Sequence, residues 1–77
     1  MAGGVTFRQA IDNNKKHIVD YLNLKGASYT SDITREYKGE REQAAVRKAL
    51  NELRKEGVVI TDDKVAMWRG KRWELKG

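Results

Sequence analysis

The sequence contains no cysteine and no proline. Without cysteine the chain has neither a disulfide frame nor a cysteine-based zinc site, so a hydrophobic core alone must stabilise it. Proline often marks linkers, and its absence, together with the lack of repeats, favours one continuous unit. A length of 77 residues leaves room for one domain with a small core. We predict a domain over residues 7–77 after a flexible N-terminus at residues 1–6.

Long apolar runs and catalytic constellations are also missing. No segment approaches the roughly 20 apolar residues that span a bilayer, and the first residues lack the basic-then-apolar order of a signal peptide. We therefore expect no membrane partner and a cytoplasmic location, nucleoid-associated or, for a viral protein, in the host cell. His17 is the only histidine, no glycine-rich phosphate loop occurs, and Asp62-Asp63 is typical of a turn. We predict no enzymatic activity, no cofactor and no bound metal.

Basic residues exceed acidic ones, sixteen to eleven, which gives a formal net charge of +5. The excess lies in residues 41–77, which carry ten basic and six acidic side chains. Such a balance favours a polyanionic partner and fast, salt-sensitive association. The alternative is that the charge serves solubility alone.

The first helix is expected near Phe7, because Thr6 and Gln9 have the spacing of a capping box. Asp12-Asn13-Asn14 is a poor helix interior, since these side chains compete for backbone hydrogen bonds. We therefore expect two segments, and Gly26 suits the left-handed residue that ends the second. The expected segments are residues 7–12 and 14–25. The apolar residues at the start either form a dimer surface or pack within the domain.

A short extended crossing at residues 27–29 precedes a second helix that is capped by Thr30 or Ser31 and ends near Tyr37. A third helix follows at about residues 41–56, and Gly57 ends it. Its core side carries Val46, Ala49, Leu50 and Leu53. Its opposite side is either a binding surface or a solvated face on which Glu52 pairs with Lys48 and Lys55.

Two strands close the chain. Residues 58–61 are all β-branched, as in a buried strand, and Asp62-Asp63 is expected to turn the chain. Residues 72–76 alternate polar and apolar, which directs Trp73 and Leu75 to the core. Gly70 allows a tight reversal between the strands, at a tip whose position the pattern leaves open.

This order of elements resembles the winged helix-turn-helix family over about residues 14–76. The residues that carry the resemblance are Ile18-Val19-Asp20-Tyr21-Leu22, Tyr29-Thr30-Ser31-Asp32-Ile33, Val46 to Gly57, and Arg72-Trp73-Glu74-Leu75. It implies an α+β fold of three helices with a C-terminal β-hairpin wing. It also implies binding to double-stranded DNA, with the recognition helix, about 41–56, in the major groove and the wing, about 62–72, on the backbone.

The resemblance implies roles for individual residues. Arg47 and Asn51 are the expected base readers, since Arg pairs with guanine and Asn with adenine. The other positions on the helix are Arg41, Gln43, Ala44 and Lys48, of which Arg41, Gln43 and Lys48 suit phosphate. On the wing they are Lys64, Trp68, Arg69, Lys71 and Arg72, with contact expected chiefly from Arg69 to Arg72. Trp68 stacks on a sugar or base, or else covers the base of the wing.

A narrower comparison concerns Z-DNA-binding winged helices, which are similar in size and have a tryptophan near the last strand. Those domains read the zigzag backbone with an Asn and a Tyr on the third helix and with a proline-containing wing. Here the nearest alignment places Arg47 and Asn51 at those helix positions, and no proline is present. We therefore do not expect Z-DNA binding.

We therefore predict a sequence-selective DNA-binding protein that acts as a small transcriptional regulator, and its size and economy suggest a prokaryotic or phage origin. Specific binding calls for a homodimer or for tandem copies, because one module buries only roughly 600–1,000 Å² on DNA. The alternative is a winged helix that acts as a protein adaptor or inhibitor, which Glu36, Glu40 and Glu42 favour. A third possibility is RNA or single-strand binding through Trp68 and Tyr29.

Overall fold

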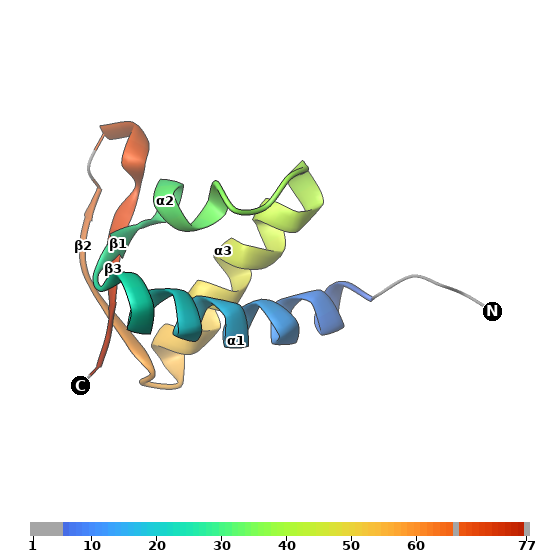
Figure 1. Cartoon of the computed structure of the whole chain (residues 1–77), viewed down its shortest axis with the longest axis horizontal. Coiled ribbons are helices and arrows are strands. Elements are labelled where there is room, and N and C mark those ends of the chain that lie inside the picture. The colour runs from blue at the N-terminus through green and yellow to red at the C-terminus, as the bar shows by residue number, and fades with distance from the viewer. Residues whose placement is uncertain (1–5, 66, 77) are drawn as a thin grey trace.

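The computed structural model describes residues 6–65 and 67–76, so the predicted flexible N-terminus lies outside the described residues except for Thr6. Its elements are α1 (Phe7–Lys25), β1 (Ser28–Tyr29), α2 (Thr30–Thr34), α3 (Glu40–Lys55), β2 (Val59–Val65), the 3₁₀ turn η1 (Met67–Arg69) and β3 (Lys71–Leu75). The strands form an antiparallel sheet in the order β1-β3-β2. Figure 1 shows the β2–β3 hairpin at one end of the molecule, with its turn on the side away from α1.

α1 is one continuous helix, so the expected break at Asp12-Asn13-Asn14 is wrong. The start is as predicted: the Gln9 amide donates to Thr6 Oγ1, and the Thr6 amide donates to Gln9 Oε1, both over 3.1 Å. Burial explains the continuity, because Ala10, Ile11, Ile18 and Leu22 pack in the core on the side that also buries Asn14. Tertiary packing therefore outweighs the low helix propensity of the Asp-Asn-Asn run.

The apolar start of α1 packs within its own domain. Ile11 is 2% exposed and Ala10 is 9% exposed, whereas Phe7 at the helix start is 39% exposed. Of the two alternatives, a dimer surface or packing within the domain, the structure shows packing within the domain for Ala10 and Ile11.

α2 is shorter than predicted and ends at Thr34 instead of Tyr37. Its N-cap is Tyr29, whose amide donates to Asp32 Oδ2 over 3.1 Å, so the expected cap at Thr30 or Ser31 is wrong. The chain then continues in tight turns, with the Tyr37 amide donating to the Thr34 carbonyl. This geometry leaves the Thr30 hydroxyl available for the wing.

β2 runs through Asp62 and Asp63, where the sequence pattern predicted a turn. Asp62 Oδ1 accepts from the Lys64 amide over 3.0 Å, and the register with β3 shifts between Thr61 and Val65. The local bond of the aspartate therefore produces an irregularity inside the strand, not a reversal. The reversal comes later, at η1 and Gly70, whose φ of 80° is left-handed.

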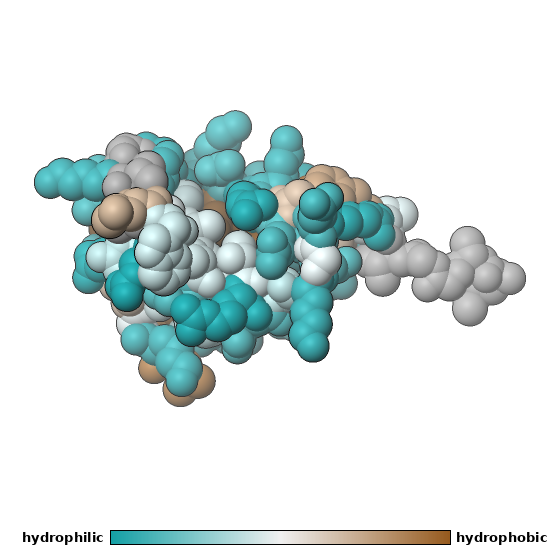
Figure 2. Space-filling model, turned by 90° about the horizontal axis from the view of Figure 1, so that it is seen from above, coloured by the Kyte–Doolittle hydropathy of each residue, from teal (hydrophilic) through white to brown (hydrophobic). Residues whose placement is uncertain are grey.

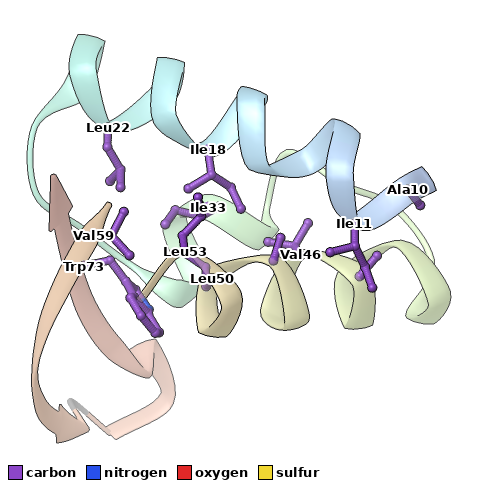
Figure 3. Packing of buried hydrophobic residues seen from close by; sticks show 12 residues of the cluster. Ala10, Ile11, Ile18, Leu22, Ile33, Val46, Leu50, Leu53, Val59 and Trp73 are labelled. Carbon is purple, nitrogen blue, oxygen red and sulfur yellow. The ribbon is translucent and has the colours of Figure 1, made fainter. Parts of the chain in front are cut away.

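A single core joins α1, α2, α3 and the sheet (Figure 3). The largest fully buried side chains are Ile18, Ile33, Val46, Leu50 and Val59. Trp73, at 3% exposure, closes the core from the sheet, as its place in the alternating strand predicted. In the part of the chain that the structure describes, no helix is both long and apolar enough to cross a bilayer.

Ion pairs join α1 to the side of α3 that faces it. Glu52 Oε1 lies 2.6 Å from Arg8 Nη2 and 3.0 Å from Lys15 Nζ, and Lys15 Nζ lies 2.6 Å from Glu56 Oε2. The alternative of intrahelical pairs from Glu52 to Lys48 and Lys55 is therefore wrong. Hydrogen bonds from Arg8 and Lys15 lower the pKa of Glu52 from 4.5 to about 2.

These ion pairs predict acid sensitivity. Because the pKa of Glu52 is lowered in the folded state, its stabilising contribution is present above the unfolded value of 4.5 and is lost as the pH falls toward about 2. Glu52→Gln removes that contribution. We expect the melting temperature of the variant, measured by circular dichroism, to be lower than that of the parent at neutral pH. Between pH 5 and pH 2 the melting temperature of the variant should fall by less than that of the parent. Glu74→Gln is the matched control, and equal pH dependence of all three proteins would contradict the assignment.

Candidate nucleic-acid interface

The exposed side of α3 carries most of the predicted recognition residues. Successive residues turn by about 100°, so the buried Val46, Ala49 and Leu50 direct the intervening side chains outward. The predicted recognition residues exposed there, here called the outer face of α3, are Arg41, Ala44, Arg47, Lys48 and Asn51. The division into an inner and an outer side is therefore as the apolar spacing predicted.

Gln43 differs from the other predicted recognition residues. Its side chain is half-buried, and Nε2 donates to the Tyr37 carbonyl over 3.2 Å. This bond ties the start of α3 to the segment that follows α2. The amide nitrogen is thus engaged within the fold, and a phosphate contact from Gln43 stays a prediction.

Arg47 and Asn51 meet the wing in a cleft between α3 and β3. The cleft has a volume of about 210 Å³ and is lined by Thr30, Arg47, Leu50, Asn51, Lys71 and Trp73. The cleft thus brings together three predicted site residues, Arg47 and Asn51 from α3 and Lys71 from β3, although Lys71 lies 20 positions after Asn51 in the sequence. Alternation along β3 directs Lys71 to the same side as the buried Trp73, which is the side of α3.

Thr30 connects the wing to the helices and was missed as a site residue. The Trp73 indole Nε1 donates to Thr30 Oγ1 over 2.8 Å, and Thr30 Oγ1 donates to the Lys71 carbonyl over 3.2 Å. Gly70 packs so closely that an added Cβ would lie 2.9 Å from Thr30 Cβ. The sequence indicated only a helix cap here, because nothing local signals a contact 43 residues away.

The remaining wing residues point elsewhere. Arg72 is exposed and pairs in register with Tyr29, on the sheet face opposite to Trp73. Lys64 is exposed on β2, and Trp68 and Arg69 are exposed on η1. The structure therefore divides the wing cations into Lys71 beside α3 and the others at the turn or on the far face.

Acidic and basic side chains of α3 lie on different sides of the helix beyond its first turn. Glu52 and Glu56 turn toward α1 and pair with its cations. Within residues 6–65 and 67–76, neither Arg47 nor Lys48 has an ion-pair partner. Glu40, in the first turn, remains exposed near the outer face. The outer face thus keeps positive charge beyond its first turn.

Figure 2 views the molecule from the side on which the hairpin's turn lies, and most of the visible surface is hydrophilic, with separate hydrophobic patches. No group of three or more potential metal ligands is found among the described residues. The side of the molecule seen in Figure 2 is therefore mainly hydrophilic.

No protein-family model matches the sequence, and no curated protein matches it. Among solved structures, the chain is similar to the Zalpha domain from Carassius auratus PKZ, which was crystallised in complex with Z-DNA. The TM-score is 0.68 at 20% identity, and the likeness covers 87% of this chain and 98% of that chain. At this sequence identity the likeness to the Zalpha domain shows the fold alone. The protein has a winged-helix fold, as predicted.

The contact between Gly70 and Thr30 predicts a measurable cost. Gly70→Ala places a Cβ 2.9 Å from Thr30 Cβ at a φ of 80°, whereas Gly39→Ala, at a φ of 92°, meets nothing within 4 Å. Backbone strain alone costs about 1–3 kcal/mol in either variant. We expect Gly70→Ala to lose more free energy of unfolding than Gly39→Ala in urea titrations. An equal loss would show that the wing does not depend on this close packing.

Proposed function

We propose that this chain binds double-stranded DNA sequence-selectively, with α3 in the major groove and the wing on the adjacent backbone. The observation that carries the proposal is the α3–wing cleft, which holds Arg47, Asn51 and Lys71 and is lined by no acidic side chain. The separation of charge on α3 adds support, because Glu52 and Glu56 are held against α1.

The chemistry of the cleft suits a base edge next to a phosphate. Arg47 and Asn51 are four residues apart and lie on the same side of α3. An arginine pairs bidentately with the O6 and N7 atoms of guanine, and an asparagine pairs with the N6 and N7 atoms of adenine. A lysine serves as a point charge for phosphate, which suits Lys71 and Lys48. We infer that helix residues select the sequence while the lysines position the duplex.

The size of the domain bears on its biological role. A single module of this kind buries roughly 600–1,000 Å² on DNA, so tight specific binding calls for two copies. We therefore infer a homodimer on an inverted-repeat site and a role as a small transcriptional regulator of prokaryotic or phage type, in the cytoplasm.

Left-handed DNA is the second candidate ligand, and the neighbouring Zalpha domain in complex with Z-DNA is the observation that favours it. Both chains share the fold, and this chain has Trp73 on its last strand. The resemblance to Z-DNA readers predicts an Asn and a Tyr on the third helix, and this chain has Arg47 and Asn51 there. The side chains of Arg47 and Asn51 can each make two hydrogen bonds to a base edge in the major groove of right-handed DNA. We therefore propose right-handed DNA as the first candidate ligand and left-handed DNA as the second.

Arg47→Ala is expected to lower binding to a selected sequence more than binding to random duplex. The reason is that a good bidentate contact contributes about 1–3 kcal/mol of discrimination, roughly 5- to 150-fold. The measurement is fluorescence anisotropy with a duplex recovered by selection from a random pool. Arg69→Ala, by contrast, is expected to weaken binding to both duplexes alike.

Lys16→Ala is the matched control, since it removes one positive charge from the exposed surface of α1. Loss of affinity as salt rises would support phosphate contact. If Arg47→Ala and Lys16→Ala both bind every duplex as the parent does, the proposed reading of DNA sequence by α3 is wrong. A salt-insensitive complex with a protein would then favour the alternative of a protein adaptor or inhibitor.

The form of the bound DNA has its own test. A duplex of alternating cytosine and guanine is titrated with the protein at low salt and followed by circular dichroism above 250 nm. We expect the right-handed spectrum to persist at saturation, because Arg47 and Asn51 stand where the Z-DNA readers have an Asn and a Tyr. Inversion of the spectrum by the parent, and its loss in Asn51→Ala, would replace right-handed DNA by the left-handed form as the ligand.

A further inference from the structure

The turn of the wing carries two neighbouring apolar side chains in solvent. Met67 is 89% exposed and Trp68 is 73% exposed. Trp73, the other tryptophan, is 3% exposed and has its indole N–H bonded to Thr30. Large apolar side chains that are adjacent and this exposed often mark a contact surface. The core of this domain is complete without Met67 and Trp68.

Arg69 contacts two aromatic rings at the turn of the wing. Its Cζ atom lies 5.4 Å from the centroid of the Tyr29 ring and 5.4 Å from the centroid of the Trp68 ring. A guanidinium over an aromatic face is attracted by the ring quadrupole. Tyr29 belongs to β1, which pairs with β3 and leads into α2, so Arg69 links the turn to the body of the domain.

Gly70 adds a second anchor directly behind the turn. Its close packing against Thr30 leaves no room for a Cβ there. Met67 itself has a left-handed φ of 48°, which is uncommon for a residue with a side chain. The close packing of Gly70 on Thr30 therefore constrains the backbone two residues after Trp68.

The position of the turn fits the α3–wing cleft. Lys71, which lines the cleft, lies two residues after Arg69. In Figure 3 the hairpin extends past α3 on the side away from α1. A duplex seated on α3 and Lys71 extends past the cleft, and Trp68, three residues before Lys71, is the exposed aromatic ring on the adjoining turn.

We propose that Trp68 stacks on an exposed nucleobase, so that the preferred ligand is duplex DNA with an unpaired or extruded base beside the α3 site. This inference rests on the proposed DNA binding and specifies its substrate. A base has a π-face whatever its identity, so the indole contact tolerates any base while Arg47 and Asn51 select sequence. Arg69 acts as a positioning residue, because its guanidinium holds the indole.

The test compares two duplexes of one sequence, fully paired and with one unpaired nucleotide, by anisotropy at fixed salt. We expect the parent to bind the second duplex about tenfold tighter, and Trp68→Ala to bind both alike. Trp68→Phe keeps a ring and should retain most of the preference. Leu24→Ala, which removes an 80% exposed side chain from α1, is the matched control and should change nothing.

Tryptophan emission gives an independent readout, because the chain has two tryptophans and Trp73 is buried. The duplex with the unpaired nucleotide should quench the parent's emission more than the fully paired duplex does, whereas the two duplexes should change the emission of Trp68→Phe alike, because only Trp73 in the cleft remains. A preference that persists in Trp68→Ala, or equal binding of both duplexes by the parent, would overturn the stacking inference alone. Failure of every protein to bind either duplex would overturn the proposed function together with it.

Discussion

The bond from the Trp73 indole to the Thr30 hydroxyl is the contact on which the arrangement of this winged helix depends. It joins the last strand to the first residue of α2 over 2.8 Å, and the same hydroxyl donates to the Lys71 carbonyl. A buried indole N–H left without a partner costs about 1–3 kcal/mol, so the bond also determines how Trp73 enters the core. This contact holds β3 against α2, and Thr30 and Trp73 both line the α3–wing cleft.

Local chemistry made much of the fold predictable. The capping box at Thr6, the glycine after Lys25 and the apolar spacing on α3 each depend on residues within one or two turns. The errors came where distant packing opposes a local preference. The Asp-Asn-Asn run stays helical because Ile11 and Ile18 are buried on either side of it, and Asp62 bends β2 without ending it.

The candidate site was predictable in its helix and only partly in its wing. Helical periodicity alone directed Arg47 and Asn51 outward. The role of Thr30 and the convergence of Lys71 with α3 depend on contacts across roughly 20 to 40 residues, which no spacing rule reports. The same limit applied to Glu52: the alternative of a solvated face paired it with its neighbours on the helix, whereas Arg8, 44 positions away, binds it.

The irregular register of β2 has a consequence for assembly. β2 and the two-residue β1 are the two edges of the sheet, and edges offer free backbone groups to strands of other chains. The shift between Thr61 and Val65, with the Asp62 carboxylate bonded to the Lys64 amide, interrupts the pattern that an incoming strand would have to match. β1 is too short to template one. The register shift in β2 and the shortness of β1 therefore disfavour strand-to-strand pairing at both edges of the sheet.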